Sequence, residues 1–213
     1  MTKPTDLLTK KIPEIVNAAV AEMKSLGEQG DADAKQRHAD LASAPGAARV
    51  VLEGKGGADV YLVSEGAVLS ADTQKPSAPV LLALAVAAEA VELGLEELES
   101  ELEQALAFVR RRLVRLSPKK TRAALDKLAG EQLSFHLVIK DTPDFEEVRV
   151  KIATGSAEPP EQPKFTVTVD WETLEQVRKR KLKPQVLLSK LQLSGDSARA
   201  MQLGMELMQR RSS

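Results

Sequence analysis

The chain has 213 residues, a formal net charge of −1 at pH 7 and 43% hydrophobic residues, the composition of an ordinary globular protein long enough to bury a core. Cysteine is absent, so disulfides, thiolate nucleophiles and cysteine-bound metals are excluded. The balanced charge gives no reason to expect a nucleic-acid partner. No apolar segment follows the N-terminal lysines, and the longest apolar run, residues 79–88, is too short to cross a bilayer, so we expect a cytoplasmic protein.

Hydrophobic periodicity in the first half predicts a helix followed by a short β-meander. Apolar residues recur at helical spacing over residues 12–26, and the alanine-rich residues 31–45 predict a helix fragment and a loop. Strands are expected at residues 50–52, 60–63, 67–69 and 80–86. The glycines of residues 54–57 favour a hairpin turn, because the spacing and the Lys-Ser/Thr pair of a phosphate-binding loop are absent.

The longest helical pattern runs from residue 87 to about residue 116. Its charges are segregated, with glutamates in the first part and a cluster of arginines at the end, Arg110, Arg111, Arg112 and Arg115. The helix macrodipole favours this order and accounts for it. The alternative is that the basic end contacts an anionic membrane or a ligand head group.

A break at Ser117-Pro118 divides the chain into two halves, residues 1–116 and 117–213. The second half opens with a helix and contains four strands with one apolar face each, so the sheet must be covered by helices. These strands are expected at residues 133–139, 148–152, 165–171 and 191–193. Asp170 and Asp196 are placed to cap the helices that follow the last two strands, and Pro184 can begin a helix between them.

Three motifs near the C-terminus carry a resemblance to a known family. They are Lys181-Leu182-Lys183-Pro184, Lys190-Leu191-Gln192-Leu193-Ser194-Gly195-Asp196 and Ala200-Met201-Gln202-Leu203. In this order and spacing the motifs resemble the sterol carrier protein 2 family of lipid-binding domains, and the resemblance covers residues 121–211. It implies an α/β fold in which a five-stranded mixed sheet is covered by helices, with an apolar tunnel that accepts sterols, fatty acids or acyl chains.

The last helix offers a candidate ligand wall. Met201, Met205 and Met208 lie on one stripe, and methionine side chains adapt to varied apolar shapes. From the pattern alone, a core stripe and a ligand wall explain these residues equally well, and the resemblance favours the ligand wall. The residues expected to contact the ligand lie on the sheet face and on the helices that cover it: Phe165, Val167, Val169, Trp171, Leu174, Val177, Leu187, Leu191, Leu193, Met201, Met205 and Met208.

The sequence contains no set of residues that predicts catalysis. The two histidines, His38 and His136, lie far apart, and no nucleophile motif or metal-ligand spacing accompanies them. We therefore expect a non-enzymatic protein without cofactor or metal. The resemblance implies that it binds and transfers a hydrophobic lipid. We also expect transient contact with anionic membranes, and a monomer or weak homodimer. The alternative function is protein association, with a filled tunnel and the long helix forming a seam between subunits or domains.

The two halves share an order of elements. In each half a strand ending in glycine, at residues 60–66 or 148–155, precedes an irregular loop, a further strand and a helix. We therefore expect the first half to be a degenerate copy of the second, which would make the chain an internal pseudo-dimer. The first half lacks the Lys-Leu-x-Leu-x-Gly-Asp strand and the methionine helix, so the pattern does not predict a second complete lipid site. An unrelated α/β domain is the alternative for this half.

Overall fold

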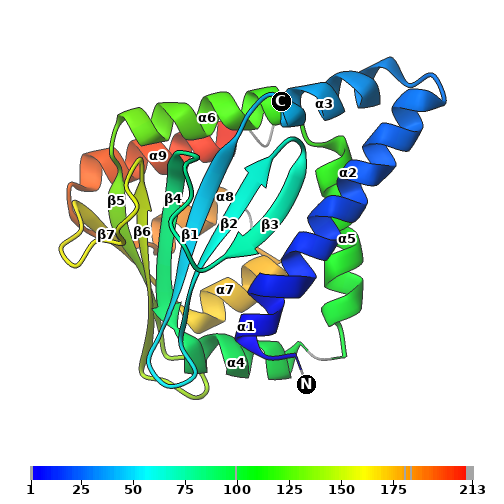
Figure 1. The fold of residues 1–213 in the computed structure, drawn as a ribbon. Coiled ribbons are helices and arrows are strands. Elements are labelled where there is room, and N and C mark those ends of the chain that lie inside the picture. Colours follow the sequence, from blue (N-terminus) through cyan, green and yellow to red (C-terminus); the bar gives the residue numbers. More distant parts are fainter. Residues whose placement is uncertain (1, 99, 180, 183, 210–213) are drawn as a thin grey trace.

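The computed structural model describes residues 2–98, 100–179, 181–182 and 184–209. One mixed sheet of eight strands runs through this part of the chain in the order β3-β2-β1-β4-β6-β5-β7-β8, so the α/β class is confirmed and the expected five-stranded sheet is wrong (Figure 1). The strands are β1 (Gly46–Glu53), β2 (Ala58–Glu65), β3 (Val68–Asp72), β4 (Val80–Ala87), β5 (Ser134–Lys140), β6 (Glu147–Thr154), β7 (Phe165–Asp170) and β8 (Gln192–Gly195).

Two overlapping groups of five strands repeat one pattern of pairing. Along β3-β2-β1-β4-β6 the successive pairs are antiparallel, antiparallel, parallel and antiparallel. Along β4-β6-β5-β7-β8 the same four pairings follow in the same order. The sheet exceeds five strands because β4 and β6 pair directly, which continues it across the boundary expected between residues 116 and 117.

The helices lie around this sheet and do not all follow the expected limits. They are α1 (Pro4–Asp6), the π-helix η1 (Leu7–Lys11), α2 (Ile12–Glu28), α3 (Ala32–Ala42), α4 (Ala88–Glu97), α5 (Leu102–Arg115), α6 (Pro118–Gly130), α7 (Trp171–Arg178), α8 (Pro184–Lys190) and α9 (Ser197–Gln209). The single helix expected from residue 87 to about residue 116 is wrong, because α4 and α5 are separate and lie along different edges of the molecule (Figure 1). Glu97, Glu101 and Glu103 flank the break, and like charges one turn apart disfavour a continuous helix.

Strand register places a row of large apolar residues on one face of the sheet. Partners across six strands form this row: Val60, Val50, Leu84, Ile152, Phe135 and Phe165. In the first half the row packs against Leu8 of η1 and Ala88 of α4, and in the second half against Ala200 and Leu203 of α9. Helices therefore cover this face, as the amphipathic strands predicted.

A loop, residues 155–163, covers the other face through polar contacts. His136 Nε2 lies 2.8 Å from the Pro160 carbonyl oxygen, and Arg49 forms an ion pair of 2.7 Å with Glu158. Lys151 Nζ lies 2.9 Å from a Glu161 carboxylate oxygen and lowers the pKa of that carboxyl. The loop has no strand, as expected, and it crosses β1, β6 and β5 on the side away from the helices.

Two further sets of contacts attach helices to the edges of the sheet and to each other. The Asn17 side chain of α2 donates to the Leu69 carbonyl at 2.9 Å and accepts from the Leu69 N–H at 2.8 Å, so α2 satisfies backbone groups of the edge strand β3. α6 and α9 lie side by side (Figure 1), joined by an ion pair of 3.0 Å between Lys127 and Glu206.

Asp170 caps α7, as predicted from the sequence. Its carboxylate accepts a hydrogen bond of 2.7 Å from the Thr173 N–H and one of 2.9 Å from the Thr173 hydroxyl. The backbone bond from Thr173 lowers the pKa of Asp170 below its ordinary value of 3.8. The cap fixes the direction in which the chain leaves β7.

Replacing this cap should reduce stability in a pH-dependent way. Asp170→Ala should cost about 1 kcal/mol of unfolding free energy at neutral pH, and Asp170→Asn less, because asparagine keeps a side-chain acceptor. Since the folded pKa is lowered, the contribution of the carboxylate is present above the unfolded pKa and disappears as the pH falls through the folded value. Urea denaturation from neutral pH to about pH 3 measures this. A cost of Asp170→Ala that stays constant over that range contradicts the assignment.

Candidate functional site

An apolar pocket of about 340 Å³ lies between the sheet and helices α2, α3, α5 and α6. This volume is within the range of about 300–1,000 Å³ that is typical of small-molecule sites. On the sheet side its wall includes Ala48, Leu62 and Leu82, which are register partners on β1, β2 and β4. On the helix side it includes Val20 of α2 and Leu125 of α6. The pocket thus combines strands of the first half with a helix of the second.

Small residues at the start of β1 leave the space for this pocket. Gly46 and Ala48 occupy helix-side positions at the start of the strand, where larger residues would fill the layer between sheet and helix. A Cβ atom on Gly46 would lie 2.9 Å from Leu81 Cδ1, so the chain is already closely packed beside the pocket.

The described lining has three polar side chains, Ser64, Thr121 and Arg122. Arg122 donates one hydrogen bond of 2.6 Å to the Pro45 carbonyl and one of 2.7 Å to Asp126. Thr121, also in the lining, donates from its hydroxyl to the Ser117 carbonyl at 2.9 Å. No acidic residue belongs to the described lining. Such a surface suits an uncharged apolar chain, since a buried charge would need a partner.

The helix-side face of the central strands remains partly accessible. In β5, Phe135 and Leu137 are partly exposed, whereas His136 and Val138, on the loop side, are each 4% exposed. β4 repeats the pattern, with Leu82 and Leu84 partly exposed and Ala83 and Ala85 buried. Central strands with helices packed directly on them are normally buried on both faces. The helix layer therefore stands off from the middle of the sheet.

The structure brings most of the C-terminal candidate residues together on and beside β7. Phe165 and Val169 are 1% and 2% exposed, and Val167 is the register partner of Leu193. The ring of Phe165 stacks on that of Phe135 with centroids 5.1 Å apart. The remaining members on α7, α8 and the start of β8 are partly buried: Trp171, Leu174, Val177, Leu187 and Leu191. Phe165 and Val169 are thus core residues, and contact of this set with a ligand stays a prediction.

Met201 and Met205 are 42% and 46% exposed, and their contact with a ligand stays a prediction. The buried face of α9 is formed instead by Ala200 and Leu203, which pack on Phe165. Residues three apart lie on one helix face, whereas Met201 is rotated by about 100° from Ala200. The side chain of Met208 lies outside the described residues.

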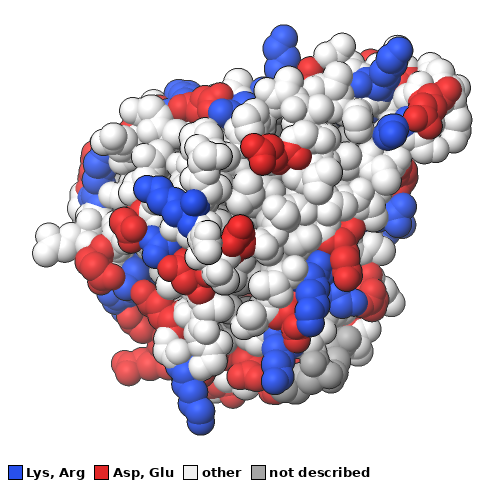
Figure 2. All heavy atoms as spheres, viewed as in Figure 1, with Lys and Arg blue, Asp and Glu red and all other residues white. Residues whose placement is uncertain are grey.

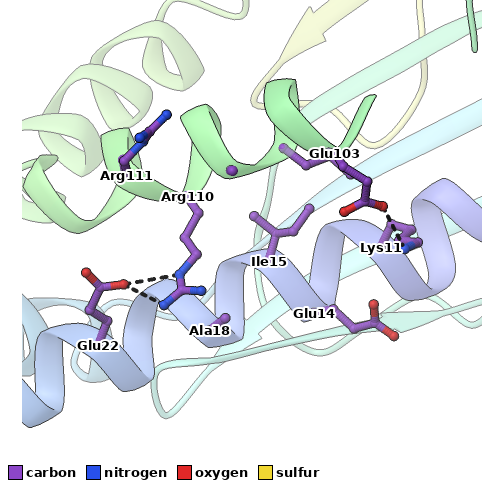
Figure 3. A pocket seen from close by; sticks show the side chains of 10 residues that line it. Lys11, Glu14, Ile15, Ala18, Glu22, Glu103, Arg110 and Arg111 are labelled. Atoms are coloured by element: carbon purple, nitrogen blue, oxygen red, sulfur yellow. Dashed lines mark hydrogen bonds and ion pairs between the residues drawn. The ribbon is translucent and has the colours of Figure 1, made fainter. Parts of the chain in front are cut away.

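A second hollow, between α2 and α5, is a polar seam (Figure 3). Ile15 and Ala18 line its middle, and ion pairs bridge the helices on either side. Lys11 lies 3.3 Å from Glu103, and Arg110 lies 2.7 Å from Glu22. These two ion pairs hold α5 to the N-terminal helices.

The described residues contain no group of three or more His, Cys, Asp or Glu side chains arranged to hold a metal ion. His136 is enclosed beneath the loop of residues 155–163 and faces away from the apolar pocket. None of the described helices combines the length and apolar character needed to span a bilayer.

Residues 110–208 match the model of the SCP-2 sterol transfer family. The matched part of the chain is similar to this family. The resemblance carried by the three C-terminal motifs is thereby confirmed, and lipid or sterol binding is the activity that the family indicates in general. No curated protein and no solved structure gives a significant match to the chain.

The SCP-2 region supplies only part of the apolar pocket. Leu113, Leu116 and Leu125 come from within the match, whereas the strand side of the wall precedes it. The pocket was not predicted from the sequence, because the first half lacks the C-terminal motifs on which the prediction of a lipid site was based. The signal available was the small-residue start of β1, residues 46–48, together with the apolar stripe of α2.

The new orientation of α9 is testable by stability. Leu203→Ala should cost about 2–4 kcal/mol of unfolding free energy, because Leu203 is buried against Phe165. Met205→Gln should change it by no more than about 0.5 kcal/mol, because Met205 is exposed. Urea unfolding of both variants measures the difference. Equal losses would show that the methionine, too, is part of the core.

Proposed function

We propose that the protein binds a lipid without catalysing a reaction, and holds the apolar part of that lipid in the pocket between the sheet and helices α2, α5 and α6. The observation that carries the proposal is the lining of this pocket, which is apolar except for Ser64, Thr121 and Arg122. The SCP-2 match supports it independently, because that family transfers sterols.

The energetics of an apolar chain in such a pocket are favourable. Each methylene removed from water contributes about 0.8 kcal/mol, so about ten of them contribute about 8 kcal/mol before the cost of association. A dissociation constant near 1 μM corresponds to about 8 kcal/mol. A long acyl chain or a sterol has more apolar area than ten methylenes, so either ligand is sufficient for binding at this affinity. Apolar walls select for volume more than for chemical identity, and the ligand is accordingly proposed as a class: sterol, fatty acid or acyl lipid.

Part of the C-terminal candidate set belongs to the same proposal. Val167 and Leu193 lie on the helix-side face that is partly accessible in β5. We assign them, with the partly buried residues of α7 and α8, to the portion of the ligand that extends over the second half of the sheet. Met201 and Met205, being exposed, are not assigned to it.

Filling the pocket tests the proposed function. The protein, purified from its host, should carry lipid in native mass spectrometry and should take up a fluorescent fatty acid or sterol saturably. Ala48→Phe should lower that affinity at least about tenfold, because the ring occupies the space of several methylenes. Ala42→Phe, the same change at an exposed position of α3, should bind as the wild type does. Absence of bound lipid and of saturable uptake in the wild type would refute the proposal.

We propose also that the two halves are copies of one domain that share strands. In the first copy β6 occupies the place that β8 has in the second, and in the second copy β4 occupies the place that β3 has in the first. A helix follows directly after both β4 and β7. The missing Lys-Leu-x-Leu-x-Gly-Asp strand of the first half is accounted for in this way, because a strand from the other half stands in its place.

A fragment comprising residues 117–213 tests strand sharing. Without β4, one edge of β6 is left unpaired, and an open edge is a template for pairing with another chain. We expect the fragment to self-associate in size-exclusion chromatography with light scattering, with the full chain as the comparison. A stable, monomeric fragment would count against strand sharing and would leave the lipid-binding proposal unaffected.

A further inference from the structure

The two halves carry an equivalent pair of residues on their parallel strands. In each half a parallel pair of strands, β1 with β4 or β5 with β7, leads into a helix that begins directly after the second strand. Counted five residues back from the last register pair, Ala48 faces Leu82 in the first half and Phe135 faces Phe165 in the second. All four residues lie on the helix side of the sheet, so the two pairs occupy corresponding places.

The two pairs differ in the volume that they fill. Ala48 and Leu82 line the apolar pocket. The rings of Phe135 and Phe165 instead stack on each other, with centroids 5.1 Å apart and an angle of 4° between their planes. Aromatic side chains bury about 150–250 Å² each, far more than the single methyl group of alanine. The second half therefore fills with two rings a place that the first half leaves open.

The helices above the two pairs also correspond. A helix ends shortly before the first strand of each half, α3 before β1 and α6 before β5. The helices α3, α6 and α9 follow one another along the same edge of the molecule (Figure 1). Leu41 of α3 and Leu125 of α6 line the pocket, whereas Leu128 of α6 and Leu203 of α9 pack in the cluster that contains Phe165. The same arrangement of helices thus covers a pocket in one half and a packed core in the other.

The space for an apolar chain lies inside the molecule. On the face drawn in Figure 2, acidic and basic side chains are intermingled, and charged groups of this kind remain in contact with water. Between the sheet and the helices the first half offers about 340 Å³. At the corresponding place in the second half, Leu133, Phe165, Ala200 and Leu203 are buried in one cluster. The halves therefore differ in the layer in which a lipid is bound.

We propose that Phe135 and Phe165 form an aromatic plug, which closes the counterpart of the apolar pocket in the second half. The chain then carries one lipid, and the pocket of the first half determines where it binds. This inference rests on the lipid-binding function proposed above. Val167 lies two residues beyond Phe165 toward α7, so it is past the aromatic plug and accessible to the end of the same lipid.

The aromatic plug lies within the part of the chain that is similar to the SCP-2 family. Residues 110–208 include Phe135 and Phe165, whereas Ala48 and Leu82 precede the match. On this proposal the matched half supplies α6 as a wall of the pocket and has no separate lipid site of its own. The identity of one residue pair, and not the similarity to the family, decides which half holds the lipid.

Exchanging the two residue pairs tests the aromatic plug. The wild type should carry one lipid per chain in native mass spectrometry and in saturation with a fluorescent fatty acid. Phe135→Ala with Phe165→Leu copies the pair of the first half into the second and should raise this number to two, because apolar cavities accept apolar ligands. Ala48→Phe with Leu82→Phe copies the aromatic plug into the first half and should lower the number to none.

A matched control separates the aromatic plug from a general loss of core volume. Leu52 is buried in a first-half cluster that contains neither ring, so Leu52→Ala should still carry one lipid. Circular dichroism should show that the variants are folded. One lipid on the folded variant without rings, one lipid on the chain with rings in both halves, or a second lipid on Leu52→Ala would overturn the aromatic plug alone. The chain with rings in both halves decides the question even where removal of the rings prevents folding. A wild type without lipid would overturn both proposals.

Discussion

The antiparallel pairing of β4 with β6 is the contact on which the rest of the structure depends. It joins Leu82 to Thr154 and Ala85 to Lys151, and therefore makes one sheet from strands of two halves. The Thr154 hydroxyl donates to the Leu128 carbonyl at 2.6 Å and accepts from the Leu133 N–H at 3.1 Å, so α6 is fastened at the same join. Because α6 is held there, a helix of the second half can cover strands of the first and close the apolar pocket.

The two faces of this sheet differ in the contacts that cover them. The loop side is held by polar contacts to Arg49, His136 and Lys151, all of which reach the proline-rich residues 155–163. The helix side leaves apolar area accessible, which is unfavourable by about 25 cal/mol for each Å². A bound apolar ligand would remove that area from water, so the feature that lowers the stability of the empty protein would drive the proposed binding.

Periodicity located nearly every strand and helix, because amphipathic patterns and caps are local properties of the sequence. Asp170 and Asp196 cap their helices as expected, with Asp196 accepting from the Arg199 N–H. The eight-stranded continuation could not be predicted, since the partner of a strand edge is not encoded in its own alternation. The break after α4 was not predicted, because the helical spacing of apolar residues continues across it. The mutual repulsion of the acidic side chains beside the break does not appear in that spacing.

The site was harder to predict than the fold for a similar reason. In α9, the methionine stripe and the stripe of Ala200 and Leu203 have nearly the same periodicity. The periodicity therefore does not show which stripe is buried, whereas the packing of Ala200 and Leu203 against Phe165 does. Gly204 shows the constraint, because a Cβ atom there would lie 3.2 Å from Leu188 of α8. The helix therefore turns its smallest side toward α8 and its methionines outward.

α5 links the pocket to the surface of the molecule. Leu102 and Val114, near the two ends of the helix, are buried, with 9% and 6% of their surface exposed. Leu102 is therefore not available for an association seam with another subunit. Between them the helix is held to α2 by exposed ion pairs, each worth about 0–1 kcal/mol and weakened by salt.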